Sequence, residues 1–109
     1  MKTAFNIVKF RVKPGKEMAF EESQREAVKR GMPGGRAFNL VRTADREYCF
    51  IGEWDTFAAI VEARPAMIAE LDRVRPLLED LGNGLGITDP VSGEAVVSWK
   101  EPTYEVMQG

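Results

Sequence analysis

The chain has 109 residues, the length of one domain with a core of its own. Its 15 Lys/Arg and 17 Asp/Glu give a net charge of −2, and no concentrated basic stretch indicates nucleic-acid binding. With no histidine and one cysteine, it cannot build a Ser-His or Cys-His catalytic pair, an intramolecular disulfide or a usual zinc site.

The first predicted element is a strand over residues 3–12, TAFNIVKFRV, which is rich in Phe, Ile and Val. The charges at Lys9, Arg11 and Lys13 interrupt it, so it lacks the continuous apolar core of a signal peptide, and no other stretch approaches transmembrane length. We therefore expect a cytoplasmic protein with no membrane partner.

A helix is predicted over residues 16–30, where one side is apolar and the rest is charged. The turn residues GMPGG end it. Two apolar runs, residues 36–43 and 47–55, flank the short polar connection at residues 44–46. Such a pair of runs is typical of a β-hairpin.

The clearest helical periodicity covers residues 57–81, with Thr56 as the expected N-cap. Pro65 and Pro76 each lack an N–H and clash with the preceding turn. We therefore expect two or three shorter helical pieces, the last of them closed by Gly82 as a C-cap.

After this helical region we expect a long loop over residues 82–93, a fourth strand over residues 94–100 and an irregular tail over residues 101–109. The glycines of the loop do not indicate phosphate binding, because they follow a helix and precede a strand, the reverse of a dinucleotide motif. The loop is a plain connector or a mobile flap at the mouth of a pocket.

The predicted order β-α-β-β-α-β indicates an α+β, ferredoxin-like fold, in which both helices cover one face of an antiparallel sheet. We expect one domain over residues 1–109, with its core in residues 3–100. The predicted strands are apolar on both faces instead of alternating, as Phe5 and Ile7 against Val8 and Phe10 illustrate. A second copy of the sheet is the simplest cover for the other face, so we expect a homodimer.

Particular residues carry a family likeness. The run FNIVKFRVKPGKEMAF, the strand end FIGEWDT leading into the helical FAAI, and the order of elements resemble the antibiotic biosynthesis monooxygenase (ABM) superfamily of dimeric α/β barrels. The likeness spans residues 3–100. It implies a ferredoxin-like monomer, dimerisation by sheet-to-sheet packing and a pocket between sheet and helices.

Members of this superfamily include cofactor-free oxygenases of polycyclic phenols and anthrones, quinol oxygenases and haem-degrading enzymes. The oxygenases use an Asn of the first strand and a Trp of the third near the substrate, and Asn6 and Trp54 stand at the matching places. The haem-degrading branch uses a His as iron ligand, which this chain lacks. We therefore expect neither haem nor another cofactor.

The residues themselves leave several roles open. A buried Asn6 needs hydrogen-bond partners, so it either joins a structural network or presents its amide to a ligand. Trp54 either stacks on an aromatic ligand or fills the core. The same question arises for four further candidates for substrate binding, which are Asn39, Tyr48, Arg64 and Arg75. Tyr104 is another possible donor to a carbonyl.

Cys49 has no cationic neighbour in the sequence, so we interpret it as a packing residue and not a nucleophile. The resemblance implies a cofactor-independent monooxygenase of small aromatic molecules such as hydroquinones or anthrones, with water, Glu53 or the acidity of the substrate accounting for the proton. The sequence leaves open whether the chain is an enzyme at all. The alternative is a non-catalytic homodimer of the same fold that binds a small molecule or serves in stress.

Overall fold

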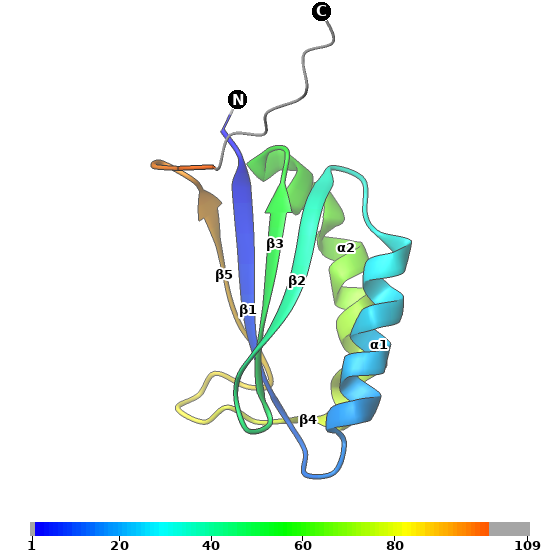
Figure 1. Ribbon diagram of the computed structural model, residues 1–109. Helices are drawn as coiled ribbons and strands as arrows, with labels where there is room; N and C mark the ends of the chain where they lie inside the picture. The colour runs from blue at the N-terminus through cyan, green and yellow to red at the C-terminus, as the bar shows by residue number, and fades with distance from the viewer. Residues whose placement is uncertain (1, 101–109) are drawn as a thin grey trace, which may run out of the picture.

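Two helices cover one face of an antiparallel sheet in the computed structural model, which describes residues 2–100 (Figure 1). The elements are β1 (Ala4–Val12), α1 (Glu17–Arg30), β2 (Gly35–Ala44), β3 (Glu47–Trp54), α2 (Phe57–Val74), a 3₁₀ turn (Arg75–Leu77), β4 (Leu78–Glu79) and β5 (Asp89–Glu94). The α+β, ferredoxin-like prediction is confirmed, with the two-residue β4 added. The predicted tail at residues 101–109, including Tyr104, lies outside the described residues.

β1 is the central strand of the sheet. The order is β2-β3-β1-β4. β4 and β5 pair with the same edge of β1, β4 at its C-terminal end and β5 nearer its N-terminus (Figure 1). In the antiparallel register, Asn6 of β1 lies opposite Gly52 of β3 on one side and Ser92 of β5 on the other. The sheet of one chain does not close into a barrel. Because β1 lies at the centre of the sheet, its middle residues lie beneath the helices.

The core between sheet and helices consists of two clusters. The first contains Phe10, Val12, Phe20, Tyr48, Val74 and Leu78, and the second contains Ala4, Trp54, Ile60 and Ala63. Burial of these side chains supplies most of the driving force for packing α1 and α2 on the sheet. Because the core is divided in this way, the layer between the clusters can hold a cavity.

The predicted break of the second helix at Pro65 is wrong. α2 runs without interruption over Phe57–Val74 with Pro65 inside it, and Thr56 caps its start as predicted, since Oγ1 accepts a 3.1 Å hydrogen bond from the N–H of Ala59. One proline removes a single hydrogen bond from the ladder, whereas the apolar stripe continues through Ile60 and Val74. The expected break at Pro76 is present, as the 3₁₀ turn.

Gly82 was expected to cap this helical region, but α2 ends at Val74 with Arg75 as its C-cap. Gly82 instead lies in the following loop with a φ of 85°, and its N–H donates a 2.6 Å hydrogen bond to Oδ1 of Asp80. The 3.6-residue apolar pattern beyond Val74 belongs to Leu78 of β4, which packs in the core.

The prediction of the last strand is also wrong. The strand is β5, which begins at Asp89 inside the expected loop, and residues 95–100 beyond it are not a strand. The run Asp-Pro-Val-Ser-Gly has a turn-like composition, but Pro90 is tolerated because β5 is an edge strand. The more strand-like residues Val96, Val97 and Trp99 are 79–89% exposed.

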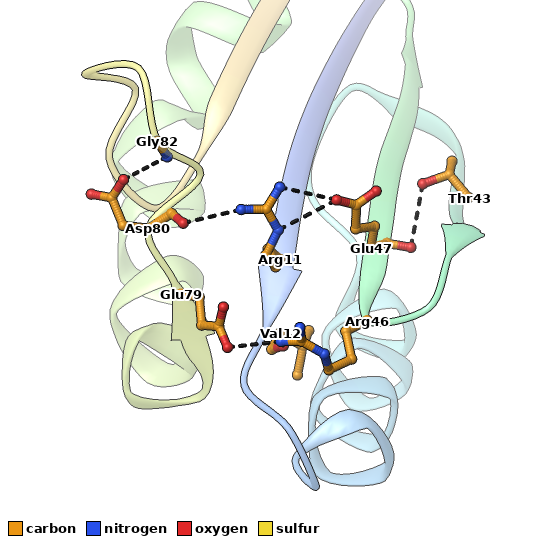
Figure 2. Close-up of polar contacts among 8 residues, drawn as sticks. All are labelled: Arg11, Val12, Thr43, Arg46, Glu47, Glu79, Asp80 and Gly82. Carbon is orange, nitrogen blue, oxygen red and sulfur yellow. Dashed lines mark hydrogen bonds and ion pairs between the residues drawn. The ribbon is translucent and has the colours of Figure 1, made fainter.

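A group of polar contacts holds the C-terminal end of β1 to its neighbours (Figure 2). Nη2 of Arg11 donates to Glu47 at 3.0 Å, and Nη1 of Arg46 donates to the carbonyl of Val12 at 2.9 Å and to Glu79 at 2.7 Å. These contacts join β1, the β2–β3 turn and β4. They fix the hairpin relative to the end of the helical layer.

The outer face of the sheet, away from the helices, is also apolar. By strand alternation Phe5 and Ile7 of β1 point there, and so do Cys49 and Ile51 of β3, all of them half-buried. Val91 of β5 is 59% exposed. Within residues 2–100, no helix combines the length and the apolar character needed to cross a membrane.

Candidate functional site

A cavity of about 500 Å³ lies between the sheet and the two helices. Its floor is formed by β1, β2, β3 and β5, and its roof by α1 and α2. The lining is mostly apolar, with Phe10, Phe38, Phe50, Trp54, Ile60 and Met67 among its members. Exposed lining residues of α2 and β5, including Ile68 and Pro90, indicate that it opens between these two elements.

Asn6 and Trp54, the two residues predicted to be central, meet in the floor of this cavity. Nε1 of Trp54 donates a 2.7 Å hydrogen bond to Oδ1 of Asn6. Trp54 is 0% exposed and Asn6 5% exposed, so water does not compete with this bond. The indole therefore fixes the orientation of the amide, with the oxygen toward Trp54 and the NH₂ away from it.

The NH₂ end of Asn6 has only a weak partner. Nδ2 lies 3.6 Å from Sδ of Met67, and a thioether is a poor hydrogen-bond acceptor. Both residues line the cavity. A ligand oxygen that displaced the methionine sulfur would gain a better hydrogen bond from this amide than the free protein provides.

Gly52 makes this arrangement possible, and sequence reasoning missed it. It lies opposite Asn6 in the register and two residues before Trp54, so the Asn6 side chain crosses over it to reach the indole. A Cβ atom on Gly52 would collide with Oδ1 of Asn6 and would lie 2.8 Å from Nε1 of Trp54. A glycine inside a strand often marks a close approach of another group to the backbone. Gly52 in the run FIGEWD could therefore have indicated this contact.

Arg64 is the one further predicted site residue that lines the cavity. Its side chain is exposed and makes no hydrogen bond to another described residue. Glu70, also in the lining, is held by Arg30 of α1, whose Nη2 donates to both carboxylate oxygens at 2.8 and 2.9 Å. The cavity thus contains no carboxylate without a cationic partner among the described residues.

The other predicted residues lie elsewhere. Arg75 is exposed, pairs with Asp72 at 2.9 Å and does not line this cavity. Asn39 and Tyr48 border an outer cleft of about 350 Å³ between α1 and the β2–β3 hairpin. This cleft adjoins the cavity, since Gln24, Val28 and Phe38 line both. Glu53 lies near Arg36, at 3.9 Å, and not in the cavity lining.

Tyr48 is a core residue, since only 2% of it is exposed. Its hydroxyl donates a 2.6 Å hydrogen bond to Oε2 of Glu21. Burial, together with the hydrogen bond to this carboxylate and its charge, raises the pKa of Tyr48 to about 12. Tyr48 therefore stays protonated and bound to Glu21 across the physiological range. Cys49 lies on the opposite, outer face and lines neither cavity nor cleft.

Comparison with known proteins places this geometry in a family. The family model described as antibiotic biosynthesis monooxygenase matches residues 3–64, which is more than half of the chain and includes both Asn6 and Trp54. No curated protein matches the chain.

Solved structures share the fold at low sequence identity. SnoaB, a cofactor-independent oxygenase from Streptomyces nogalater, superposes with a TM-score of 0.71 at 19% identity, covering 93% of this chain and all of SnoaB. A protein of unknown function from Nitrosomonas europaea gives 0.72 at 17% identity, over 95% of this chain and 98% of its own. A conserved protein from Methanosarcina mazei gives 0.69 at 13% identity, over 85% and 92%.

Proposed function

Because this chain belongs to the antibiotic biosynthesis monooxygenase family, we propose that it is a cofactor-independent monooxygenase of small aromatic molecules such as hydroquinones or anthrones. One observation carries the proposal: Trp54 holds the amide of Asn6 so that its NH₂ points into an apolar cavity. The likeness to SnoaB in fold supports the same reaction class. The cavity volume of about 500 Å³ falls in the range of ordinary small-molecule sites.

The proposed reaction uses dioxygen as the oxidant. The substrate loses a proton, from the CH₂ group opposite the carbonyl in an anthrone or from a hydroxyl group in a hydroquinone, and the resulting anion transfers an electron to dioxygen. Recombination forms a C–O bond to a peroxide, at a carbon that still carries one hydrogen. Loss of this last C–H proton and cleavage of the O–O bond then give a new carbonyl and one water, so one oxygen atom of O₂ enters each product.

In this scheme Asn6 donates a hydrogen bond from Nδ2 to the oxygen that carries the developing negative charge. A donor that is already oriented stabilises such charge without reorganising during the reaction. Trp54 acts as a positioning residue through its hydrogen bond to Asn6, and its ring is part of the wall against which an aromatic substrate packs. The apolar lining excludes water from the anion and the peroxide.

Within residues 2–100, no carboxylate is well placed to take the first proton. Glu53 lies outside the cavity, and Glu70 is neutralised by Arg30. We therefore assign the deprotonation to the substrate's own acidity, with bulk water as the acceptor before the substrate is enclosed in the cavity. Exposed Arg64 at the cavity lining favours the anionic form of the substrate.

The lack of a placed base also favours a second candidate, a non-catalytic binding protein that uses the same cavity. The two are separated by dioxygen consumption with a panel of hydroquinones and anthrones. Consumption that is lost in Asn6→Leu supports the oxygenase. Binding of these molecules without consumption of dioxygen supports the binding protein.

We also propose that the protein acts as a homodimer joined through the outer faces of its sheets, in the cytoplasm, where its single cysteine remains reduced. The half-buried Phe5, Ile7 and Ile51 form an apolar strip on that face, and Val91 extends it on β5. The exposed apolar side chains of residues 95–100 continue from the same edge of the sheet. An apolar face on an otherwise charged surface is best covered by another apolar face, and a second copy of this chain supplies an identical one.

A further inference from the structure

Gln24 is a buried polar residue that the proposed chemistry does not use. It lies on the sheet-facing side of α1, one turn after the fully buried Phe20, where an apolar residue would be expected. Only 9% of it is exposed, yet its amide makes no hydrogen bond to any residue that the structure describes. Polar side chains that are buried to this degree are usually paired within the protein, so the position of Gln24 calls for an explanation.

Its position supplies one. Gln24 lines the cavity from the α1 side, whereas Asn6 lines it from the sheet. It is not among the sealed polar atoms: in residues 2–100 the only fully enclosed side-chain oxygen or nitrogen lacking a partner is Oε1 of Glu17. The oxygen and nitrogen of the Gln24 amide are therefore accessible. Gln24 also borders the outer cleft, so it lies where the cavity and the cleft adjoin. Asn6 and Gln24 thus line one mostly apolar space, Asn6 from the sheet and Gln24 from α1.

We propose that Gln24 is a specificity-determining residue that hydrogen-bonds a second oxygen of the substrate. The substrate class is then a flat aromatic of two or more fused rings with oxygen functions at opposite ends. One oxygen binds Nδ2 of Asn6, and the far one binds the amide of Gln24. An amide both donates and accepts, so the far oxygen is either a hydroxyl or a carbonyl.

Because the rest of the lining is mostly apolar, Asn6 and Gln24 determine which pattern of substrate oxygens binds. Phe10, Phe38 and Phe50 pack on ring faces but do not distinguish one oxygenation pattern from another. A ligand with a single oxygen leaves the Gln24 amide unpaired and desolvated. Sites of this kind reject the analogue that lacks the matching polar group.

This inference rests on the proposed function for its choice of substrate, but its test does not require turnover. Isothermal titration calorimetry compares two naphthalenes: the diol with hydroxyls at opposite ends of the two rings, and the naphthol with one. We expect the intact chain to bind the diol roughly five-fold more tightly than the naphthol, the size of one net hydrogen bond.

In Gln24→Leu this preference disappears, because the leucine removes the amide without opening a large cavity. Gln24→Met is the second variant, in case leucine alters the packing of α1. Ser23→Ala is the matched control, since Ser23 is the neighbour on α1 and lines neither cavity nor cleft. A preference kept in both Gln24 variants, or no binding of the diol to the intact chain, overturns the inference. A preference lost in these variants without any dioxygen consumption by the protein supports Gln24 and contradicts the oxygenase.

Discussion

Nε1 of Trp54 and Oδ1 of Asn6 are 2.7 Å apart, and this hydrogen bond decides which end of the Asn6 amide faces the cavity. Without it the amide could rotate and present its oxygen, which would repel an anion. The proposed reactivity therefore depends on a residue that need not touch the reacting atoms. Three features of the fold together produce this hydrogen bond: the β1–β3 register, the glycine at position 52 and the burial of the indole.

Replacing Trp54 with Phe tests this dependence. The variant keeps an aromatic ring but leaves Oδ1 of Asn6 without its donor, so we expect the free energy of unfolding to fall by about 1–3 kcal/mol. We expect kcat for dioxygen consumption to fall by roughly ten-fold or more, because a misoriented oxyanion donor is partly lost. Trp99→Phe is the control, since Trp99 is 82% exposed. An unchanged kcat in Trp54→Phe would show that the hydrogen bond has no catalytic consequence.

Gly52→Ala disturbs the hydrogen bond between Asn6 and Trp54 from the backbone of β3, over which the Asn6 side chain passes. The new methyl group collides with the side chain of Asn6, so we expect a loss of about 1–3 kcal/mol in stability from overpacking. Oxygen consumption should fall with it. Gly93→Ala on β5 is the matched control, because a Cβ there meets no other atom within 4 Å. Equal stability of the two variants in urea unfolding would contradict the close packing over Gly52.

Much of this fold could be predicted from the sequence, because the apolar periodicity of α1, α2 and the hairpin agrees with their tertiary packing. The failures have local causes. Pro65 was expected to end a helix, but the packing of α2 on the sheet outweighs one lost hydrogen bond. β5 carries Pro90 and Gly93 and has the composition of a loop, yet its pairing with β1 makes it a strand.

The candidate site was only partly predictable. Strand alternation could place Asn6 on the helix-facing side, but the contact with Trp54 depends on a cross-strand register that no local pattern contains. Tyr48 and Asn39 belong to the same β2–β3 hairpin as Trp54, but they border the outer cleft. Gln24 follows Phe20 by one helical turn, on the apolar side of its helix, but the sequence alone does not show whether a glutamine there is buried or solvated.

Tyr48 predicts how stability changes at high pH. Its pKa rises from 10.0 to about 12 in the folded chain, first through burial and then through the hydrogen bond to Glu21. Between these pH values the unfolded chain loses the phenolic proton while the folded chain keeps it, so stability falls as pH rises. Relative to Tyr48→Phe, the wild type should lose about 2 kcal/mol across this window.

Urea unfolding of both proteins at several pH values measures this difference, and the comparison cancels the titration of lysines and of Tyr104. Below pH 10 the difference between the two proteins should be constant. It should favour the wild type, because the phenylalanine cannot donate to Glu21. Parallel curves up to pH 12 would contradict the raised pKa of Tyr48.

The proposed dimer predicts the effect of a charge on the outer face. Ile7→Arg places a guanidinium in the apolar strip of the central strand, and burying it without a partner is unfavourable by several kcal/mol. We expect a monomer by light scattering at concentrations where the wild type is dimeric. Val61→Arg is the control, since Val61 is 44% exposed on α2, on the helical side. A monomeric wild type, or an Ile7→Arg protein that stays dimeric, would argue against this interface.

The most direct test of the central claim is mass spectrometry of the product formed under isotopically labelled dioxygen. The proposed reaction places one labelled oxygen atom in each product molecule and the other in water, with no added metal, flavin or haem. Asn6→Leu should slow this incorporation by roughly a hundred-fold, the usual loss when an oxyanion donor is removed. An unlabelled product, or an Asn6→Leu protein that incorporates label as fast as the wild type, would contradict the assignment of this cavity as an oxygenase site.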